Sequence, residues 1–425
     1  MRVTARTYYQ DYAKTVGDLH GKLNEAMSQV STGRKYNSAS ENPIAYYAGK
    51  RMDNQYADAE AKETVIKDVQ NRLYQQEAGA RSIQQHNMRS VNTQVLALRQ
   101  DTKNVDTGTV KTYQTQFTQE LRGLVNTLNS QYDNYYVYGG NDMSTVPFSL
   151  DVDLKEDLNQ VNQSSISLTY HHRFPGEADA SHIRISYSYN KDSGHYENHY
   201  SLVDENGNAI AGKSEDDALQ KLVSAMREQG RMNTGYGSLR DRSTLIDTYT
   251  GGLNMLTGLS SDTLRNLSDE EAVKRIRGGK DGSGIEERVN AQEDSMLNSP
   301  VSLISKAILS AHNLVRNQEN GTEAQLAASR KRFDTDLAAF IDQNDNAESR
   351  ISDSYRELGV KSAALTHTKE QLSLTKDTLT AQYKDKLGID TYDAIVKMYS
   401  YQYSYNAAMK VGSHIMQSSL FEFVK

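Results

Sequence analysis

The sequence predicts a mainly α protein: helices from both chain ends form a long antiparallel bundle or coiled coil, and a mixed α+β domain is inserted between them. Three observations predict this fold. Both ends carry apolar residues at helical spacing, residues 150–300 contain runs that alternate every second residue, and only 4 prolines interrupt 425 residues. Sparse proline permits long helices, because proline removes a backbone hydrogen bond from a helix interior. We expect three domains, formed by residues 1–49 with 388–425, residues 50–147 with 300–387, and residues 148–299.

The N-terminal helix is predicted by apolar residues that recur in alternating steps of three and four, the a/d seam of a coiled coil. These residues are Tyr9, Tyr12, Val16, Leu19, Leu23, Ala26 and Val30. We expect the helix to end at Gly33, because glycine readily adopts the left-handed conformation that closes many helices. The next helix is expected to start at Pro43, which a first helical turn tolerates, with Ser40 as its candidate cap.

A second helix is predicted over residues 44–99. Its apolar stripe loses phase between Ile83 and Val91, and such a slip predicts a stutter or local unwinding of the helix. Residues 106–108 contain a glycine and break the pattern. A third helix is then expected over residues 110–135.

Residues 148–299 show a different pattern. Alternation in a composition rich in β-branched and aromatic residues predicts strands. These runs are residues 164–170, 183–189 and 199–203. Asn206-Gly207 predicts a turn, because both residues tolerate positive φ. A helix is expected after Ser214, its candidate cap, whereas the glycine-rich stretches 249–258 and 277–284 predict loops.

The C-terminal part returns to helical spacing from Pro300 onward. Five apolar residues then recur at intervals of seven: Ile351, Leu358, Leu365, Leu372 and Leu379. This narrow seam predicts a helix packed along one side, and we expect its partner to be the helix within residues 50–100 of the same chain. Gly388 predicts the end of this helix. A last amphipathic helix is expected from about Tyr392 almost to the C-terminus.

The two terminal helices have little of their own domain to pack against. Isolated helices of this length are marginal in water, and each buried Leu, Val or Met contributes roughly 1.5–3 kcal/mol. The two ends can pair with each other, and stacking of many copies would bury the rest, so we predict a polymer whose termini order on assembly. The candidate assembly residues are Tyr9, Tyr12, Val16, Leu19, Leu23, Val30, Ile395, Tyr399, Tyr403, Met409, Met416, Leu420 and Phe423.

Charge and composition argue against several classes of protein. The net charge is −7 without a long basic run, so nucleic acid is not expected as a partner. No stretch reaches the ~18 apolar residues of a membrane span, and the start lacks the apolar segment of a cleaved signal peptide, so we expect no membrane insertion. Cysteine is absent, which leaves no disulfide or thiol chemistry. The spacing supports neither a catalytic triad nor a phosphate-binding loop, so we expect no enzyme and no cofactor.

Half of the 10 histidines lie in one region of the chain: His171, His172, His182, His195 and His199. His195 and His199 superficially resemble a helical zinc motif, in which two imidazoles one turn apart reach one metal. Their segment is predicted to be a strand, where residues four apart are separated by ~13 Å. Surface histidines are therefore the simpler interpretation, and a displayed zinc peptidase is kept as an alternative.

Four segments carry a resemblance to a known family. They are MRVT at residues 1–4, STGRKYNSASENPIAYY at 31–47, YVYGGNDMSTVPF at 136–148 and AAMKVGSHIMQSSLFEFVK at 407–425. Together they resemble the type 3 hook-associated proteins of the bacterial flagellum, which form the hook–filament junction and belong to the flagellin-like superfamily. The sequence departs from the family at the acidic pair before the turn proline, which here is Glu41-Asn42.

The resemblance implies a structural subunit that joins hook to filament. The terminal helices would form the inner tube of the assembly, the long helices the next shell, and the inserted domain the outside. The implied partners are further copies in a ring or short helical layer, a neighbouring hook-associated protein, flagellin and an export chaperone. The implied location is extracellular, on the flagellum, after type III export without a cleaved signal peptide.

Two other functions remain open on the sequence. Flagellin, the filament subunit, shares the same terminal pattern, although the MRVT start and the SLFEFVK ending are unlike it. The inserted domain also suits a surface adhesin that binds a host or carbohydrate ligand, because its predicted strands are rich in tyrosine.

Overall fold

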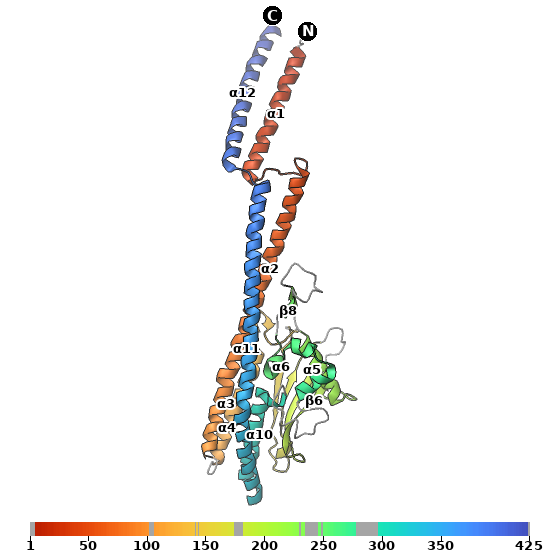
Figure 1. Ribbon diagram of the computed structural model, residues 1–425, viewed down its shortest axis with the longest axis vertical. Coiled ribbons are helices and arrows are strands. Elements are labelled where there is room, and N and C mark those ends of the chain that lie inside the picture. The colour runs from red at the N-terminus through yellow and green to blue at the C-terminus, as the bar shows by residue number, and fades with distance from the viewer. Residues whose placement is uncertain are drawn as a thin grey trace. The chain divides into compact units, whose positions relative to one another are not determined.

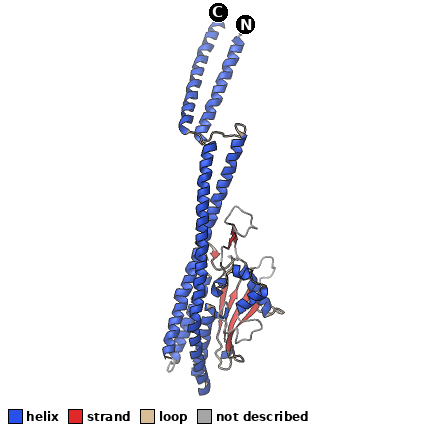
Figure 2. Cartoon of the chain, viewed as in Figure 1, coloured by secondary structure: helices blue, strands red, loops and turns tan. Residues whose placement is uncertain are grey.

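The computed structural model describes residues 5–101, 106–140, 142, 144–173, 182–228, 231–233, 245–247, 250–277 and 296–423. These residues form a mainly α fold with a mixed α+β part, as the sequence predicts (Figures 1 and 2). The chain divides into two compact units. The terminal unit contains residues 1–65 and 368–425, and the central unit contains residues 66–367. The three predicted domain boundaries stay a prediction.

The terminal unit is built from α1 (Ala5–Thr32), the first part of α2 (Pro43–Ser82), the last part of α11 (Glu323–Leu387) and α12 (Thr391–Phe423). Figure 1 shows α1 and α12 side by side with the two chain ends at the same end of the pair. The helices are therefore antiparallel. Both terminal helices were predicted, and both are present.

The predicted ends of α1 and α11 are confirmed at Gly33 and Gly388. Gly33 has a φ of 65°, a left-handed conformation in which glycine is favoured. The segments after the two helices also pair with each other, because the N–H of Lys35 donates to the carbonyl of Leu387 at 2.7 Å and that of Ile389 to the carbonyl of Gly33 at 3.2 Å. This backbone pairing lies where α1 and α11 end and α12 begins.

The start of α2 at Pro43 is confirmed, but its cap differs from the prediction. The side-chain oxygen of Asn42 accepts the N–H of Ala45 at 3.0 Å. The hydroxyl of Ser40 lies 2.7 Å from that of Ser38 instead. Asn42 is adjacent to the first helical residue and reaches an unpaired N–H of the first turn, whereas Ser40 lies too far upstream.

The predicted phase slip corresponds to a π-helix. α2 continues into η1 (Ile83–Met88), a π-helical segment, and then into α3 (Arg89–Asp101). A π turn accommodates an extra residue, so Ile83 and Val91 are both fully buried although they lie eight residues apart. The predicted local unwinding is confirmed.

The predicted third helix is too long at its C-terminal end. α4 spans Thr107–Leu128, and it is followed by a short hairpin of β1 (Gln131–Tyr132) and β2 (Tyr135–Tyr136). Asp133 and Asn134, between the strands, have φ values of 48° and 66°. Asp and Asn tolerate this left-handed conformation, which a tight hairpin turn requires. The turn chemistry overrides the helical spacing of the tyrosines.

The central unit contains a four-stranded antiparallel sheet in the order β3-β4-β5-β6. The strands are β3 (Phe148–Asp153), β4 (Ser165–Tyr170), β5 (His182–Asn190) and β6 (His195–Val203). All three predicted strands are present, and Asn206-Gly207 lies in the turn after β6, with Gly207 at a φ of 82°. A second, two-stranded sheet pairs β7 (Arg231–Asn233) with β8 (Leu245–Asp247).

Short helices surround this sheet. α5 (Glu215–Arg227) begins at the predicted cap Ser214, which forms a capping box with Asp217. The others are η2 (Val161–Gln163), α6 (Gly252–Thr257), α7 (Ser261–Arg265), α8 (Asp269–Arg277) and η4 (Met296–Asn298).

The predicted loop at residues 249–258 is wrong, because α6 lies within it and is buried throughout. A Cβ at Gly252 would lie 2.6 Å from the Phe148 ring, so glycine here permits close packing rather than a loop. Most of the other glycine-rich stretch, residues 278–284, lies outside the described residues.

Two long helices complete the chain. α10 (Pro300–Asn320) is capped by Ser299, and α11 follows after a break at Gly321 that the spacing did not indicate. The seam residues Ile351, Leu358, Leu365, Leu372 and Leu379 are all buried. Within the central unit, the side-chain amide of Gln70 on α2 donates to the carbonyl of Ser362 at 3.2 Å and to the Thr366 hydroxyl at 2.8 Å. These bonds support the predicted packing of the seam helix beside α2.

Among the described residues, none of the helices combines the length and the apolar character that crossing a membrane requires.

Candidate assembly site

The seam of α1 faces α12. The Tyr12 hydroxyl donates to the carbonyl of Ala408 at 2.8 Å, and the rings of His20 and Tyr405 have centroids 5.5 Å apart. The predicted assembly residues of α1 are all half-buried: Tyr9, Tyr12, Val16, Leu19, Leu23 and Val30. The structure thus uses this side of α1 for pairing within the chain.

The side of α12 that contacts α1 was not among the predicted assembly residues. It consists mainly of small and aromatic residues, with one methionine, in steps of three and four: Ala394, Met398, Tyr401, Tyr405, Ala408 and Gly412. Ala394 is almost fully buried, and a Cβ at Gly412 would lie 1.9 Å from the Tyr12 hydroxyl. Small residues permit this close approach. Their spacing is visible in the sequence, but the more apolar residues on other faces of α12 obscure it.

The predicted residues of α12 mostly point to solvent. Tyr399 is 61% exposed, Tyr403 80% and Met409 49%, whereas Ile395 is half-buried. Met416, Leu420 and Phe423 lie in the helix, but their side chains are outside the described part of the chain. The structure therefore brings the predicted α1 residues onto α12 and leaves three of the predicted α12 residues without cover.

Four exposed residues on α12 form a single stripe, here called the outer stripe: Tyr392, Val396, Tyr399 and Tyr403. An α-helix turns about 100° per residue, which places the four within about 60° of one another. The same turn places Ala394, Tyr405 and Ala408 on the opposite side of the helix. The outer stripe thus faces away from α1.

The α2 and α11 segments of the terminal unit are joined by charged groups. Lys376 lies 3.0 Å from a Glu63 carboxylate oxygen, and Arg34 lies 3.6 Å from Asp53 while its guanidinium covers the Tyr383 ring at 5.5 Å. The Glu63 carboxylate raises the pKa of Lys376, and burial raises the pKa of Tyr383. These contacts are partly exposed to solvent, so each contributes little to the stability of the fold on its own.

The five histidines do not share one site. His195 and His199 lie on β6, where they pair with Asn190 and Ser186 of β5, and His171 contacts His182 at 4.5 Å between ring centroids. Burial lowers the pKa of both His171 and His182. Within the described residues, no three or more His, Cys, Asp or Glu side chains are grouped so that they could hold a metal ion.

Comparisons with known proteins do not assign the chain to a family. No protein-family model matches the chain, and no curated protein matches it. Among solved structures, the chain is similar to that of a Vibrio parahaemolyticus protein, which is provisionally described as a flagellar hook-associated protein. It is 12% identical, aligns over 82% of this chain and 100% of its own length, and has a TM-score of 0.43. A likeness this distant establishes neither a shared fold nor a shared role.

Proposed function

We propose that this chain is a structural, non-enzymatic subunit of the bacterial flagellum that joins hook to filament and assembles through its terminal helices. The outer stripe is the observation that carries the proposal. It presents three tyrosines and a valine on the side of α12 that α1 leaves uncovered. The four sequence segments that resemble the hook-associated proteins supply the identity of the assembly.

A second copy of the chain is the proposed occupant of the outer stripe. A tyrosine buries roughly 150–250 Å² at about 25 cal/mol per Å², so burial of the stripe contributes on the order of 10 kcal/mol before costs. Association itself costs an estimated ~4–15 kcal/mol. One stripe is thus marginal alone, and several contacts per subunit are needed. A ring or short helical layer of heterologous contacts provides them.

The remaining partners follow from the same proposal. Neighbouring layers would be a second hook-associated protein and flagellin, and an export chaperone would cover the C-terminal helix before assembly. An exposed apolar helix face in a monomer is a liability for aggregation. A chaperone that covers this helix until export through the flagellar channel would prevent aggregation. The assembled protein would lie outside the cell.

The first experiment deletes the gene in the bacterium that encodes the chain. We expect cells without filaments that release flagellin into the medium, because filament subunits are exported but have no junction on which to polymerise. Wild-type protein supplied in trans should restore filaments, and a fluorescent tag should mark one spot at the filament base. If the chain is flagellin instead, the deletion abolishes released flagellin and the tag labels the whole filament.

The second experiment tests the outer stripe directly. The double variant Tyr399→Ser/Tyr403→Ser should fail to restore filaments although it is exported, whereas the control Gln402→Ser should restore them. Gln402 is exposed on the same turn of α12 but lies outside the stripe. Full restoration by the double variant would contradict assembly through this face.

A further inference from the structure

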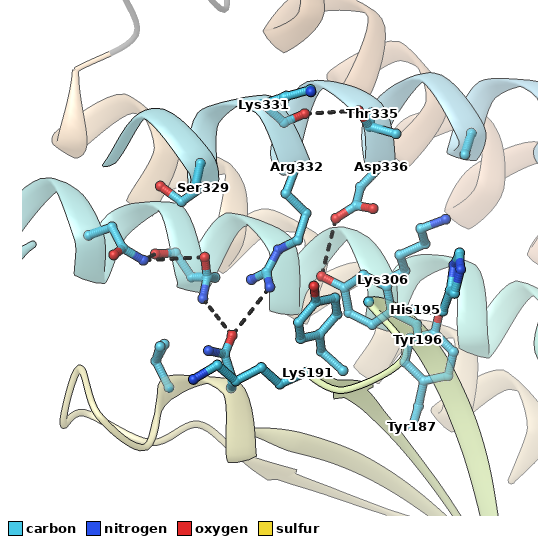
Figure 3. Close-up of a pocket in the computed structure, with 18 of the residues that line it drawn as sticks. Tyr187, Lys191, His195, Tyr196, Lys306, Ser329, Lys331, Arg332, Thr335 and Asp336 are labelled. Atoms are coloured by element: carbon cyan, nitrogen blue, oxygen red, sulfur yellow. Dashed lines mark hydrogen bonds between the residues drawn. The ribbon is translucent and has the colours of Figure 1, made fainter. Parts of the chain in front are cut away.

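A pocket of about 800 Å³ lies within the central unit, between β5, β6, η2, α10 and α11 (Figure 3). Its size falls within the roughly 300–1,000 Å³ of small-molecule sites. Neither the terminal helices nor the proposed assembly contacts use it. Its lining therefore requires a separate explanation.

The pocket is lined by an excess of positive charge. Four cationic side chains line it, Lys191, Lys306, Lys331 and Arg332, against a single carboxylate, Asp336. This imbalance contrasts with the net charge of −7 for the whole chain. Low-dielectric walls lined by one sign of charge concentrate ligands of the opposite sign.

Asp336 is already engaged by the protein. Its Oδ2 accepts the Tyr196 hydroxyl at 3.2 Å and the Ser310 hydroxyl at 2.6 Å. Burial raises the pKa of Asp336, and the nearby Lys306 opposes that shift. A carboxylate held in this way by two hydroxyls is a structural group, and it only partly compensates the cations around it.

Lys306 is the most deeply buried of the three lysines in the pocket. Its ammonium lies 5.9 Å from the centre of the Tyr196 ring, and within the described part of the chain it makes no hydrogen bond or ion pair. Burial lowers the pKa of Lys306, and the nearby Asp336 carboxylate opposes that shift only in part. A desolvated ammonium without a hydrogen-bonded anion is costly, so an anion bound in the pocket would offset that cost.

Arg332 is held in place, and the described residues engage only one of its N–H donors. Its guanidinium lies 3.9 Å from the centre of the Tyr189 ring, and one nitrogen donates to the Asn162 side chain at 3.2 Å. The Asn313 amide donates to the same oxygen at 3.1 Å. Figure 3 shows Arg332 and Asp336 extending from α11 into the pocket. A guanidinium has five N–H donors in a planar fork that matches a carboxylate.

The rest of the lining is rich in neutral donors and acceptors. Amides and hydroxyls from α10 and α11 contribute: Asn313, Asn317, Gln325, Ser329 and Thr335. Several of them already bond within the chain, as the Asn317 amide does to Asn313 and the Ser329 hydroxyl to the Leu326 carbonyl. An amide or hydroxyl keeps further donor and acceptor capacity after one such bond, which can pair with ligand hydroxyls. We propose that this pocket binds an acidic saccharide, with its carboxylate between Lys306 and Arg332 and its hydroxyls on the amide-rich wall.

The experiment uses the purified full-length chain and a panel of saccharides. Uronate- and sialate-containing oligosaccharides are compared with their neutral parent sugars on a glycan array, and the strongest binder is titrated by calorimetry. We expect an acidic member to bind at least tenfold more tightly than its neutral parent. Inorganic phosphate is titrated alongside as a control. If the pocket binds phosphate but no saccharide, it is a site for small free anions, and that result overturns the proposal.

Two pocket variants and a matched control locate the binding. Arg332→Gln and Lys306→Met should each weaken it at least tenfold, while Arg330→Gln should leave it unchanged. Arg330 is an exposed cation on the same helix, outside the pocket. Because Lys306 lies among buried groups, the surface pair Lys191→Gln/Lys331→Gln gives an independent measure, with an expected loss of at least threefold. Equal binding by Arg332→Gln and Arg330→Gln, or no binding by any acidic saccharide, would refute the inference.

Discussion

At the scale of single residues, the terminal unit depends on close approach between α1 and α12. Gly412 is a point of close approach, because a Cβ there would lie 1.9 Å from the Tyr12 hydroxyl. Gly17 and Gly21 on α1 have nothing within 4 Å of an added Cβ. The same substitution at these positions must therefore have opposite effects on the helix pair.

We predict that Gly412→Ala destabilises the terminal helix pair by about 1–2 kcal/mol, because Tyr12 must rotate and its hydrogen bond to Ala408 is lost. Gly21→Ala should instead stabilise it by about 0.5–1 kcal/mol, because alanine is the better helix former. Amide hydrogen exchange along α1 measures both. Equal protection in the two variants would contradict the observed pairing of α1 with α12.

A second residue-scale prediction concerns His312, which is buried in the central unit. Its Nε2 donates to the Lys155 carbonyl at 3.0 Å, and its Nδ1 lies 3.3 Å from the Gln114 amide. A neutral ring satisfies both contacts, and burial lowers the pKa of His312 from its ordinary value of 6.5. The unfolded chain therefore binds more protons in acid, and the free energy of unfolding falls as pH drops below about 6.5.

The measurement is the free energy of unfolding between pH 7 and pH 5, with His312→Gln beside the wild type. The variant should lose stability less steeply as the pH falls. His171 and His182 also have lowered pKa values, but they remain in both proteins and cancel in the comparison. Parallel curves would show that His312 contributes nothing to the slope.

At the scale of elements, much of the helical architecture could be predicted, because glycine and proline mark helix ends and apolar spacing marks buried faces. Gly33, Pro43 and Gly388 lie where the sequence placed helix boundaries. The two wrong predictions, the end of the third helix and the loop at residues 249–258, have a common cause. The end of α4 and the start of α6 depend on turn geometry and on packing against Phe148, which are tertiary effects that local spacing does not carry.

The π segment gives an element-scale prediction. Deleting the exposed Gln85 removes the extra residue between Ile83 and Val91, so a regular α-helix should keep both on the buried face, with a loss of at most about 2 kcal/mol. Deleting the exposed Thr93 from α3 instead rotates Val95 and Leu98 by about 100°. That deletion should cost more than about 4 kcal/mol. Chemical denaturation followed by circular dichroism compares them, and equal losses would argue against this role of η1.

The candidate sites differ in how far the sequence could predict them. The α1 seam was visible because large apolar residues mark it. The face of α12 that contacts α1 was missed, because alanine and glycine there carry little hydrophobic signal. The pocket could not be predicted at all, since Tyr189, Lys306 and Arg332 come from three separate elements, and only the fold brings them together.

At the scale of the whole molecule, the two units differ in how much apolar surface they bury. The main core is a single cluster drawn entirely from residues 80–351, all in the central unit. The described residues of the terminal unit bury fewer apolar side chains, three of them alanines, and these are Ala26, Met52, Ala59, Leu372, Leu379, Leu387 and Ala394. Local stability follows buried apolar contact, so the terminal unit should unfold first.

Limited proteolysis of the dilute monomer tests this difference. Trypsin should cleave within about the first 45 and last 40 residues and leave a resistant fragment that contains the central unit, because helices with an uncovered face open at low cost. Under conditions in which copies assemble, the same sites should become protected, since the outer stripe is then buried. Slow, cooperative exchange of amides at both ends of the dilute monomer would show that the terminal helices need no neighbours, and the case for assembly through them would lose its physical basis.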